Sequence, residues 1–395
     1  QALFQIPFGF LSDRYGRKRM IYAGLLIFAL GSVVAALADS IYGVILGRAL
    51  QGGGAVSAAV MALAADLTRE EHRLKVMATI GVTIGVSFAV SMILGPVLNG
   101  WIGVPGIFWL TGLLALLSMA VVRFQVPDPA LSRVHRDAEP VAAQFGRVLH
   151  DGQLLRLNFG IFILHLLLTA TFVAVPLALR DAGLPSDRHW QVYLAALLFS
   201  MVAMAPFIIL AEKRRQLKAV LLGAVLTLAL TEFGLLVWHD SVLETTLLLL
   251  IFFTAFNLLE AMLPSLIAKM APPDAKGTAM GVYSSSQFLG AFAGGALGGW
   301  LRGLFGLPGV FALATLAALV WLVVALTMKS PRYLHSYLLN VGVVSEDEAR
   351  SLTQRLREAP GVAEAVVIAA EGVAYLKVDR QILDEVALQH IAAPA

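Results

Sequence analysis

The chain has 395 residues, of which 58% are hydrophobic and only 14% are charged. Soluble domains have about 25% charged residues, and a soluble fold could not bury this much apolar surface, so most of the chain is expected to lie in lipid. The net charge of +3 does not indicate nucleic-acid binding, because the basic residues stand in short clusters between apolar runs. The absence of cysteine excludes disulfides, cysteine-ligated metals and cysteine nucleophiles.

Apolar runs of about 20 residues predict membrane-spanning helices. They fall at 20–38, 42–65, 74–100, 105–125, 154–179, 190–211, 217–237, 243–267, 277–300 and 306–328. A partial run precedes residue 11, and the chain begins inside it. We therefore expect that the sequence is truncated at its N-terminus and that the first helix of a twelve-helix protein is missing.

Lysine and arginine concentrate in alternate loops, such as 14–19 and 213–218, whereas the other loops hold only Arg180, Arg188 and Arg302. By the positive-inside rule the basic loops are cytoplasmic. We expect a multi-pass protein of the bacterial inner membrane with a cytoplasmic C-terminal domain.

The chain repeats itself. The segment 7–14 aligns without gaps on 206–213, and Gly100-Trp101 meets Gly299-Trp300 at the same offset. Two matches at one offset indicate two parallel halves. The predicted divisions are an N-terminal bundle (1–126, helices two to six), a polar cytoplasmic linker (127–153), a C-terminal bundle (154–330, helices seven to twelve) and a soluble domain (331–395).

The tail after Pro331 carries charges throughout and shorter apolar runs. Ser345 followed by Glu348 predicts a capping box at the start of a helix. The expected order is β-α-β-β-α, with strands at 334–343, 362–369 and 373–378 and helices at 346–358 and 382–391. This is a ferredoxin-like arrangement. The predicted fold class is thus an all-α membrane protein with a small α+β ferredoxin-like domain.

The segment 9–18, GFLSDRYGRK, resembles the signature loop between helices two and three of the major facilitator superfamily. A carboxylate at the C-terminal end of a helix opposes the helix dipole, and an arginine or the N-terminus of another helix stabilises it. The resemblance implies a latch for the outward-open state, in which Asp13 docks near Gly277. The alternative is a basic loop that only sets topology. The candidate latch residues are Gly9, Asp13, Arg14, Gly16, Arg17, Lys18 and Gly277.

Two further segments resemble motifs of this superfamily. Arg48 begins a sequence, RALQG, that is similar to the fourth-helix motif, which implies proton coupling or pairing within the first bundle; a snorkelling arginine is the alternative. A second group is similar to the antiporter motif and favours efflux, although ordinary packing of small residues is an equal reading. That group consists of Gly85, Gly95, Pro96 and Gly100.

Polar residues also lie inside the predicted spans of the second half. The resemblance implies a cavity lined by helices one, four, seven and ten, so His165, Asn257 and Glu260 are the best cavity candidates. Gln287, a buried polar residue of helix eleven, is a further candidate. A carboxylate in such a cavity could take up and release a proton, so Glu260, His165 and Arg48 are the coupling candidates. The alternative role for Glu260 is an ion pair that closes the cytoplasmic side. Glu232 is expected at the periplasmic rim.

The segments 159–165 and 257–261, together with the tail, look like the YajR branch of the superfamily, whose members are regarded as proton-driven efflux transporters. Part of the tail, Pro360 to Val367, also resembles heavy-metal-associated domains. Those domains bind metal through cysteines, so neither a metal nor a cofactor is expected in this chain.

The sequence contains no phosphate-binding glycine loop, Walker pattern or nucleophile elbow, so neither an enzyme nor an ATP-driven pump is expected. We expect a proton-coupled exporter of small or xenobiotic compounds that works by rocker-switch alternating access. An uptake carrier or facilitator, and a non-transporting sensor that uses the tail as its output, remain alternatives. The expected partners are the lipid bilayer, a small-molecule substrate and the proton, without nucleic acid. The membrane part is expected to be monomeric, and the tail to bind a protein or ligand.

Overall fold

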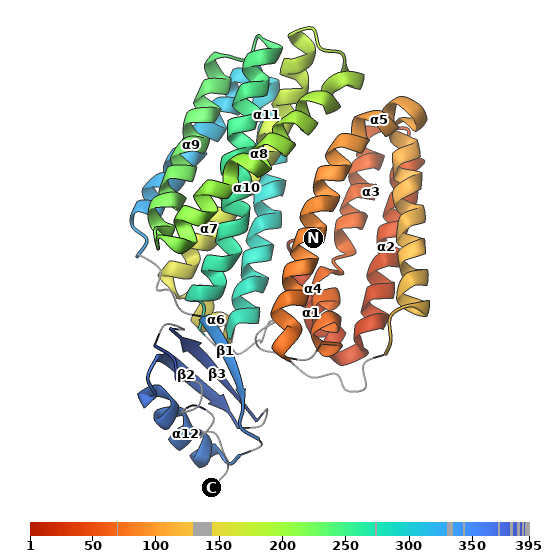
Figure 1. Ribbon diagram of the computed structural model, residues 1–395. Coiled ribbons are helices and arrows are strands. Elements are labelled where there is room, and N and C mark those ends of the chain that lie inside the picture. Colours follow the sequence, from red (N-terminus) through yellow and green to blue (C-terminus); the bar gives the residue numbers. More distant parts are fainter. Residues whose placement is uncertain are drawn as a thin grey trace.

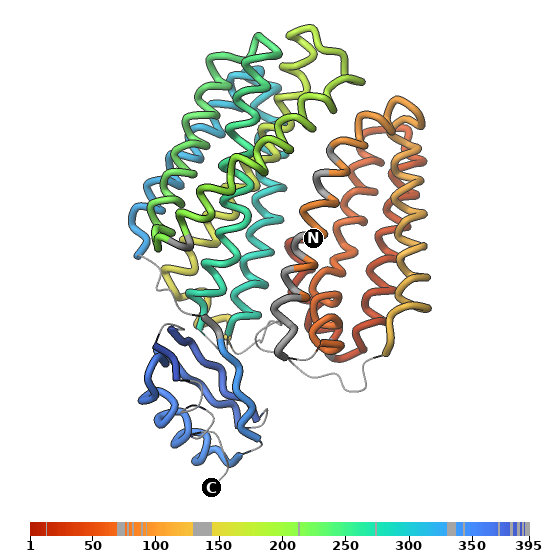
Figure 2. Tube along the Cα trace, in the orientation of Figure 1, coloured from red at the N-terminus to blue at the C-terminus, as the bar shows by residue number. Residues whose placement is uncertain are grey.

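The computed structural model describes residues 1–68, 70–128, 144–272, 275–329, 335–342, 344–369, 372–379, 382–384, 388 and 391. Two helical bundles stand side by side, and a small domain lies below the second of them (Figure 1). The tube in Figure 2 follows the chain from the red N-terminal bundle through the green and cyan bundle to the blue C-terminal domain. We call the end of the bundles that faces this domain the basic end, because it carries the loops at 14–19 and 213–218.

The first bundle begins with two helices joined at Gly16, whose φ of 96° allows a tight turn. Its last helix, α5, reverses direction at Gly103, where φ is 68°, and returns as a second arm (Figure 1). The predicted spans 74–100 and 105–125 are therefore the two arms of α5. The helices are α1 (Gln5–Tyr15), α2 (Arg17–Ala36), α3 (Ile41–Gly53), α4 (Ser57–Asp66) and α5 (Glu70–Phe124).

The second bundle has the same construction. Its last helix, α11, reverses at Gly306, where φ is again 68°, and a proline follows two residues later in both halves. This shared reversal supports the internal repeat expected from the sequence. The elements are the short α6 (Phe145–Leu149), α7 (Gly152–Asp181), the 3-10 turn η2 (Ser186–Arg188), α8 (His189–Lys213), α9 (Leu217–Val237), α10 (Val242–Met270) and α11 (Lys276–Leu326).

The span predicted at 42–65 is broken in two, because α3 ends at Gly53 and α4 begins at Ser57. Three consecutive glycines, at 52–54, stand where α3 ends, and glycine is a poor helix former. A Cβ added to Gly54 would overlap the carbonyl oxygen of Gly24 on α2. The expectation of one continuous helix was therefore wrong, since the chain unwinds where two backbones come into contact.

Small residues let α11 pack directly on α7. A Cβ at Gly290 would overlap the carbonyl oxygen of Phe162, and one at Gly294 would overlap that of Leu166. Thr169 on α7 also donates to the carbonyl oxygen of Ala291 at 2.9 Å. Close contact of backbones through small residues stabilises helix pairs in lipid.

The corresponding glycines of α5 have no such neighbour in the described part of the chain. A Cβ at Gly85, Gly95 or Gly100 would meet no described atom within 4 Å. The packing role expected for these glycines and for Pro96 stays a prediction.

Gly294→Ala is expected to destabilise the second bundle by about 1–3 kcal/mol, because the added methyl group overlaps the backbone of α7. Gly295→Ala is the matched control, since a Cβ there meets nothing within 4 Å. Thermal unfolding in detergent measures both variants. Equal midpoints for the two variants would contradict the packing described above.

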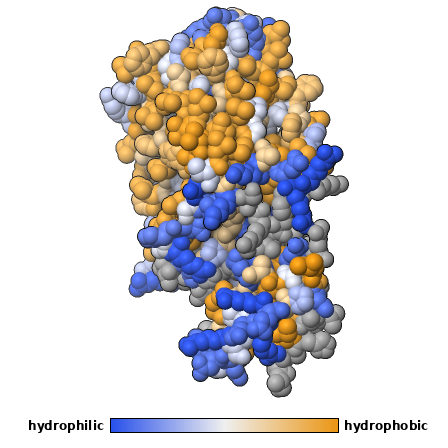
Figure 3. All heavy atoms as spheres, turned by 90° about the vertical axis from the view of Figure 1, so that its left-hand side faces the viewer, coloured by the Kyte–Doolittle hydropathy of each residue, from blue (hydrophilic) through white to orange (hydrophobic). Residues whose placement is uncertain are grey.

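The outer surface of the second bundle is apolar. Figure 3 shows a continuous hydrophobic area over this face, above a hydrophilic band at the basic end. Large apolar side chains of α9 and α11, such as Leu230, Phe233 and Val323, are exposed. A surface of this size and composition fits the hydrocarbon region of a bilayer.

The C-terminal domain is a three-stranded antiparallel sheet with helices on one face. The strand order is β1-β3-β2, and Leu376 at its centre pairs with Tyr337 on one side and Ala365 on the other. The predicted capping box at Ser345 and Glu348 is confirmed. Most of the helix predicted at 382–391 lies outside the described residues, although Leu388 and Ile391 are helical. The elements are β1 (His335–Asn340), α12 (Glu346–Glu358), β2 (Val362–Ile368) and β3 (Val373–Val378).

Candidate functional site

Three polar residues predicted from the sequence meet inside the second bundle. His165 on α7, Glu260 on α10 and Gln287 on α11 come from different helices. The Gln287 amide nitrogen lies 2.8 Å from Nε2 of His165 and donates to Oε1 of Glu260 at 3.2 Å. Nε2 of His165 lies 3.9 Å from Oε2 of Glu260. We call these residues the polar cluster.

The surroundings of the polar cluster are largely apolar. The His165 ring packs against Phe256, which lies one helical turn before Glu260 on α10, with ring centroids 5.8 Å apart. The His165 side chain is 13% exposed, whereas that of Glu260 is 37% exposed. The Glu260 side chain is partly exposed, but its Oε2 is buried without a hydrogen-bond partner among the residues that the structure describes, and the partner of its Oε1 is a neutral amide.

Two of the three side chains, the Glu260 carboxyl group and the His165 imidazole, are of the types that can bind and release a proton. When the amide of Gln287 donates to Nε2 of His165, the neutral ring carries its hydrogen on Nδ1. Protonation of Glu260 would remove a charge and change the hydrogen bond to Gln287. Because the polar cluster joins α7, α10 and α11, this change would alter the contacts among three helices. Among the described residues, no group of three or more His, Asp or Glu side chains is placed to hold a metal.

Asn257 lies on the same helix but takes a different partner. Its amide donates to Oγ of Ser200 on α8 at 3.0 Å, and the Ser200 hydroxyl donates to the carbonyl oxygen of Leu197. Asn257 thus connects α10 to α8, and the polar cluster is completed by Gln287 instead. Its role as a cavity residue stays a prediction.

Glu232 is not a rim residue. Its side chain is fully buried, and Oε1 accepts a hydrogen bond from the Thr171 hydroxyl at 2.6 Å. The expectation was wrong because the sequence indicates how deep a residue lies in the membrane but not which side of a uniformly apolar helix faces inward. Burial of a carboxyl group inside a bundle is costly, which makes Glu232 a second acid of interest.

The loop between α1 and α2 is held by a buried ion pair. Nε of Arg17 lies 3.0 Å from Oδ2 of Asp66, and both side chains are at most 2% exposed. Nη1 of Arg17 also donates to the Ser12 hydroxyl at 2.9 Å, and Ser12 donates to the carbonyl oxygen of Gly9. Asp66 was not predicted as a partner, because a single aspartate at the end of a helix is an ordinary feature of any sequence.

Lys18 fixes the other side of the same loop. Its Nζ donates to the carbonyl oxygen of Val126 at 2.6 Å and lies 2.8 Å from Oδ1 of Asp128. The nearby ammonium group of Lys18 holds the pKa of Asp128 below its usual value. Arg14 instead lies over the ring of Tyr15. The basic residues of the motif thus have different partners, and Arg17 and Lys18 connect the loop to α4 and to the end of α5.

The two bundles touch near this loop. Helix α1 contacts α11, whose first turn contains the buried Gly277. The side chain of Asp13 lies outside the described part of the chain, so its docking near Gly277 stays a prediction. A second contact was not expected from the sequence: Phe145 of α6 packs edge-on against Phe10 of α1, while Val148 of α6 is buried in the core of the second bundle.

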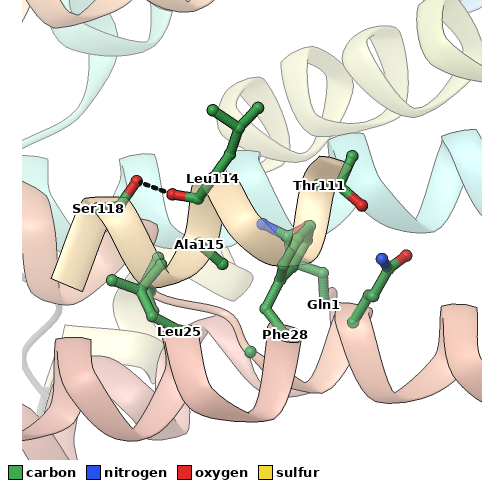
Figure 4. Close-up of a pocket in the computed structure, with 10 residues that line it drawn as sticks. Gln1, Leu25, Phe28, Thr111, Leu114, Ala115 and Ser118 are labelled. Carbon is green, nitrogen blue, oxygen red and sulfur yellow. Dashed lines mark hydrogen bonds between the residues drawn. The ribbon is translucent and has the colours of Figure 1, made fainter. Parts of the chain in front are cut away.

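Arg48 heads a hydrogen-bond chain in the first bundle. Its Nη1 donates to Oε1 of Gln51 at 2.8 Å, and Gln51 donates to Oγ of Ser32 at 2.6 Å. Gln51 also lines a pocket of about 360 Å³ in which Leu25 and Phe28 of α2 face Thr111 and Ala115 of α5 (Figure 4). Arg48 therefore has a hydrogen-bond partner within its own bundle, and its role in proton coupling stays a prediction.

Comparison with known proteins gives matches over both parts of the chain. The family model of the Major Facilitator Superfamily matches residues 1–217 and 194–338, and that of the YajR YAM domain matches residues 343–392. The inner membrane transport protein YajR of Escherichia coli (strain K12) is 47% identical over 97% of this chain and 84% of that protein. Multidrug resistance protein MdtH of Yersinia pestis (strain Pestoides F) is 25% identical over 79% and 80%.

A solved structure shows the same fold. The human organic anion transporter MFSD10 (TETRAN) aligns with a TM-score of 0.59 and 23% sequence identity, and the alignment covers 82% of this chain and 80% of that one. At this identity the likeness concerns the fold alone.

Proposed function

Because this chain belongs to the Major Facilitator Superfamily, and within it to the YajR branch with a C-terminal YAM domain, we propose that it exports small or xenobiotic compounds in exchange for protons. The observation that carries the proposal is the polar cluster, which places a carboxyl group inside a membrane bundle beside a histidine and an amide. The similarity to a multidrug resistance protein, and the antiporter-like sequence at Gly95-Pro96, support export over uptake.

In the proposed mechanism, Glu260 takes a proton from the side of higher proton concentration and releases it on the other. The neutral and charged forms differ in their hydrogen bonds to Gln287, and hence in how α10 and α11 pack. A ligand or proton shifts a conformational equilibrium only through its different affinity for the two states. Alternating protonation and compound binding would therefore drive the two bundles, residues 1–126 and 154–330, between outward-open and inward-open arrangements.

We further propose that the basic end is cytoplasmic and that the α1–α2 loop is the latch of the outward-open state. The ion pair between Arg17 and Asp66 fixes the loop from behind. Helix α1 contacts α11, and docking at the first turn of α11 would bring an aspartate such as Asp13 to the backbone amides of the helix N-terminus.

Transport measurements on the protein in proteoliposomes test the proposal. Liposomes that contain a pH-sensitive dye would be challenged with lipophilic cations and with sugars, under an imposed pH gradient. We expect proton movement evoked by at least one cationic or amphipathic compound. Compound movement without proton movement would instead indicate a facilitator, and binding without any movement would indicate a sensor.

A further inference from the structure

The sheet of the C-terminal domain is covered on both faces. Ala374, Leu376 and Val378 of β3 belong to the core that the domain forms with α12. The alternate residues Tyr375 and Lys377 point to the opposite face, yet they are only 5% and 1% exposed. Leu388 and Ile391 pack into the same core as α12, so they do not cover this second face.

The membrane bundle covers it. Strand β1 contacts α10, and Nζ of Lys377 donates to the carbonyl oxygen of Ala268 at 3.0 Å and to that of Lys269. Both carbonyls belong to the last turn of α10, which ends at Met270. The last four carbonyls of an α-helix have no donor within the helix and form the negative end of its dipole. A lysine of the C-terminal domain therefore caps a transmembrane helix.

The capped helix is the one that carries Glu260. Ala268 follows Glu260 by about two helical turns, roughly 12 Å along the axis. A helix transmits a restraint at its end along its length, because its backbone hydrogen bonds keep it rigid. The docked domain is therefore in a position to restrict the movement of α10.

We propose that the C-terminal domain is an inhibitory restraint on transport, which docks on the end of α10 through Lys377 and must release for the bundles to exchange states rapidly. The inhibition of transport rests on the transport function proposed above, whereas the docking through Lys377 is independent of that function.

The charges around Lys377 give the docking a pH dependence. Burial lowers the pKa of Lys377 to about 8; Glu364, its neighbour on β2, opposes this shift, whereas Lys276 at the start of α11 adds to it. The partners on α10 are backbone carbonyls. A released lysine has its ordinary pKa near 10.5. The released state thus binds the proton more tightly, so docking strengthens as the pH rises from 8 towards 10.5, by up to about tenfold per pH unit.

A distance measurement between the domain and the bundle tests the docking. The chain has no cysteine, so Gln216→Cys at the start of α9 and Ser351→Cys on α12 would carry the only two spin labels. Both positions are exposed. We expect one narrow distance distribution in the otherwise unchanged protein and a broad one in Lys377→Met, which keeps the apolar stem but removes the donor. Arg350→Met, on the exposed face of α12, is the matched control and should leave the distribution narrow.

Three outcomes separate the parts of the proposal. A narrow distribution in Lys377→Met would overturn the docking role of Lys377, whether or not the protein transports. A broad distribution with unchanged compound flux would overturn the restraint, since we expect the flux to rise severalfold on release. In Lys377→Gln the donor sits on a side chain one atom shorter, so the distance distribution should stay narrow. Docking of this variant should no longer depend on pH between 8 and 10.5, because glutamine does not titrate. If the docking still depended on pH, a group other than Lys377 would be responsible.

Discussion

Glu260→Gln is expected to reduce compound-evoked proton movement at least tenfold while compound binding stays measurable. Glutamine has nearly the same shape and can still hydrogen-bond to Gln287, but it cannot gain or lose a proton at neutral pH. The polar cluster would then lose its only carboxyl group, and the two conformations would lose the charge difference on Glu260 that couples them. The measurement is dye-reported proton flux in proteoliposomes, with compound binding followed separately.

A second carboxylate on the same helix provides the control. Glu244 lies exposed in the first turn of α10, far from the polar cluster, so Glu244→Gln should leave the flux unchanged. Evoked proton movement that persists in Glu260→Gln would place the proton site elsewhere, and the buried Glu232 would be the next acid to replace.

Arg17→Met is expected to destabilise the protein by about 3–5 kcal/mol, because it removes one partner of a buried ion pair. The Asp66 carboxylate, which is fully buried, would lose the guanidinium that offsets its desolvation, and Ser12 would lose a donor. Thermal unfolding followed by tryptophan fluorescence measures the change. We expect the variant to unfold at a clearly lower temperature than the unmodified protein.

The neighbouring Arg19 separates the ion pair from the general effect of a basic loop. Its side chain is exposed, so Arg19→Met should change stability by less than about 0.5 kcal/mol. The double variant with Arg17→Met and Asp66→Leu removes both charges and should recover much of the loss, since an apolar pair avoids the desolvation cost. Equal losses in the Arg17 and Arg19 variants would contradict the role assigned to the pair.

The architecture could be predicted from the sequence because lipid imposes it. Runs of apolar residues must cross the bilayer as helices, and each predicted span is found. Two pairs of spans are joined at Gly103 and Gly306, and the span at 42–65 is divided into α3 and α4. The order of elements in the C-terminal domain is likewise confirmed wherever it is described, down to the capping box at Ser345. In these regions the structure is determined by residues that are close together in the sequence, so the sequence is enough to predict it.

Contacts between helices were harder to predict, for a physical reason. In α9 most residues are apolar, so the sequence does not reveal which side of this helix faces the protein. His165 and Glu260 could be recognised as unusual, but their joint contact with Gln287 depends on how three helices are rotated. Asp66 and the small helix α6 were not predicted, and Glu232 was placed wrongly, because each depends on a partner far along the chain.

Helix α6, which lies near the C-terminal end of the predicted linker, contacts both bundles, so this contact between the halves needs only the last part of the linker. Val148 of α6 is buried in the core of the second bundle, so α6 belongs to the second half. Phe145 of the same helix packs its ring against Phe10 of the first half. A chain divided after Asp128 would keep α6 and its ring on the second piece. Expressed together as two polypeptides, the pieces would still hold the two surfaces that bring Phe145 against Phe10. This contact between the halves therefore depends on their side chains and not on the covalent bond between them.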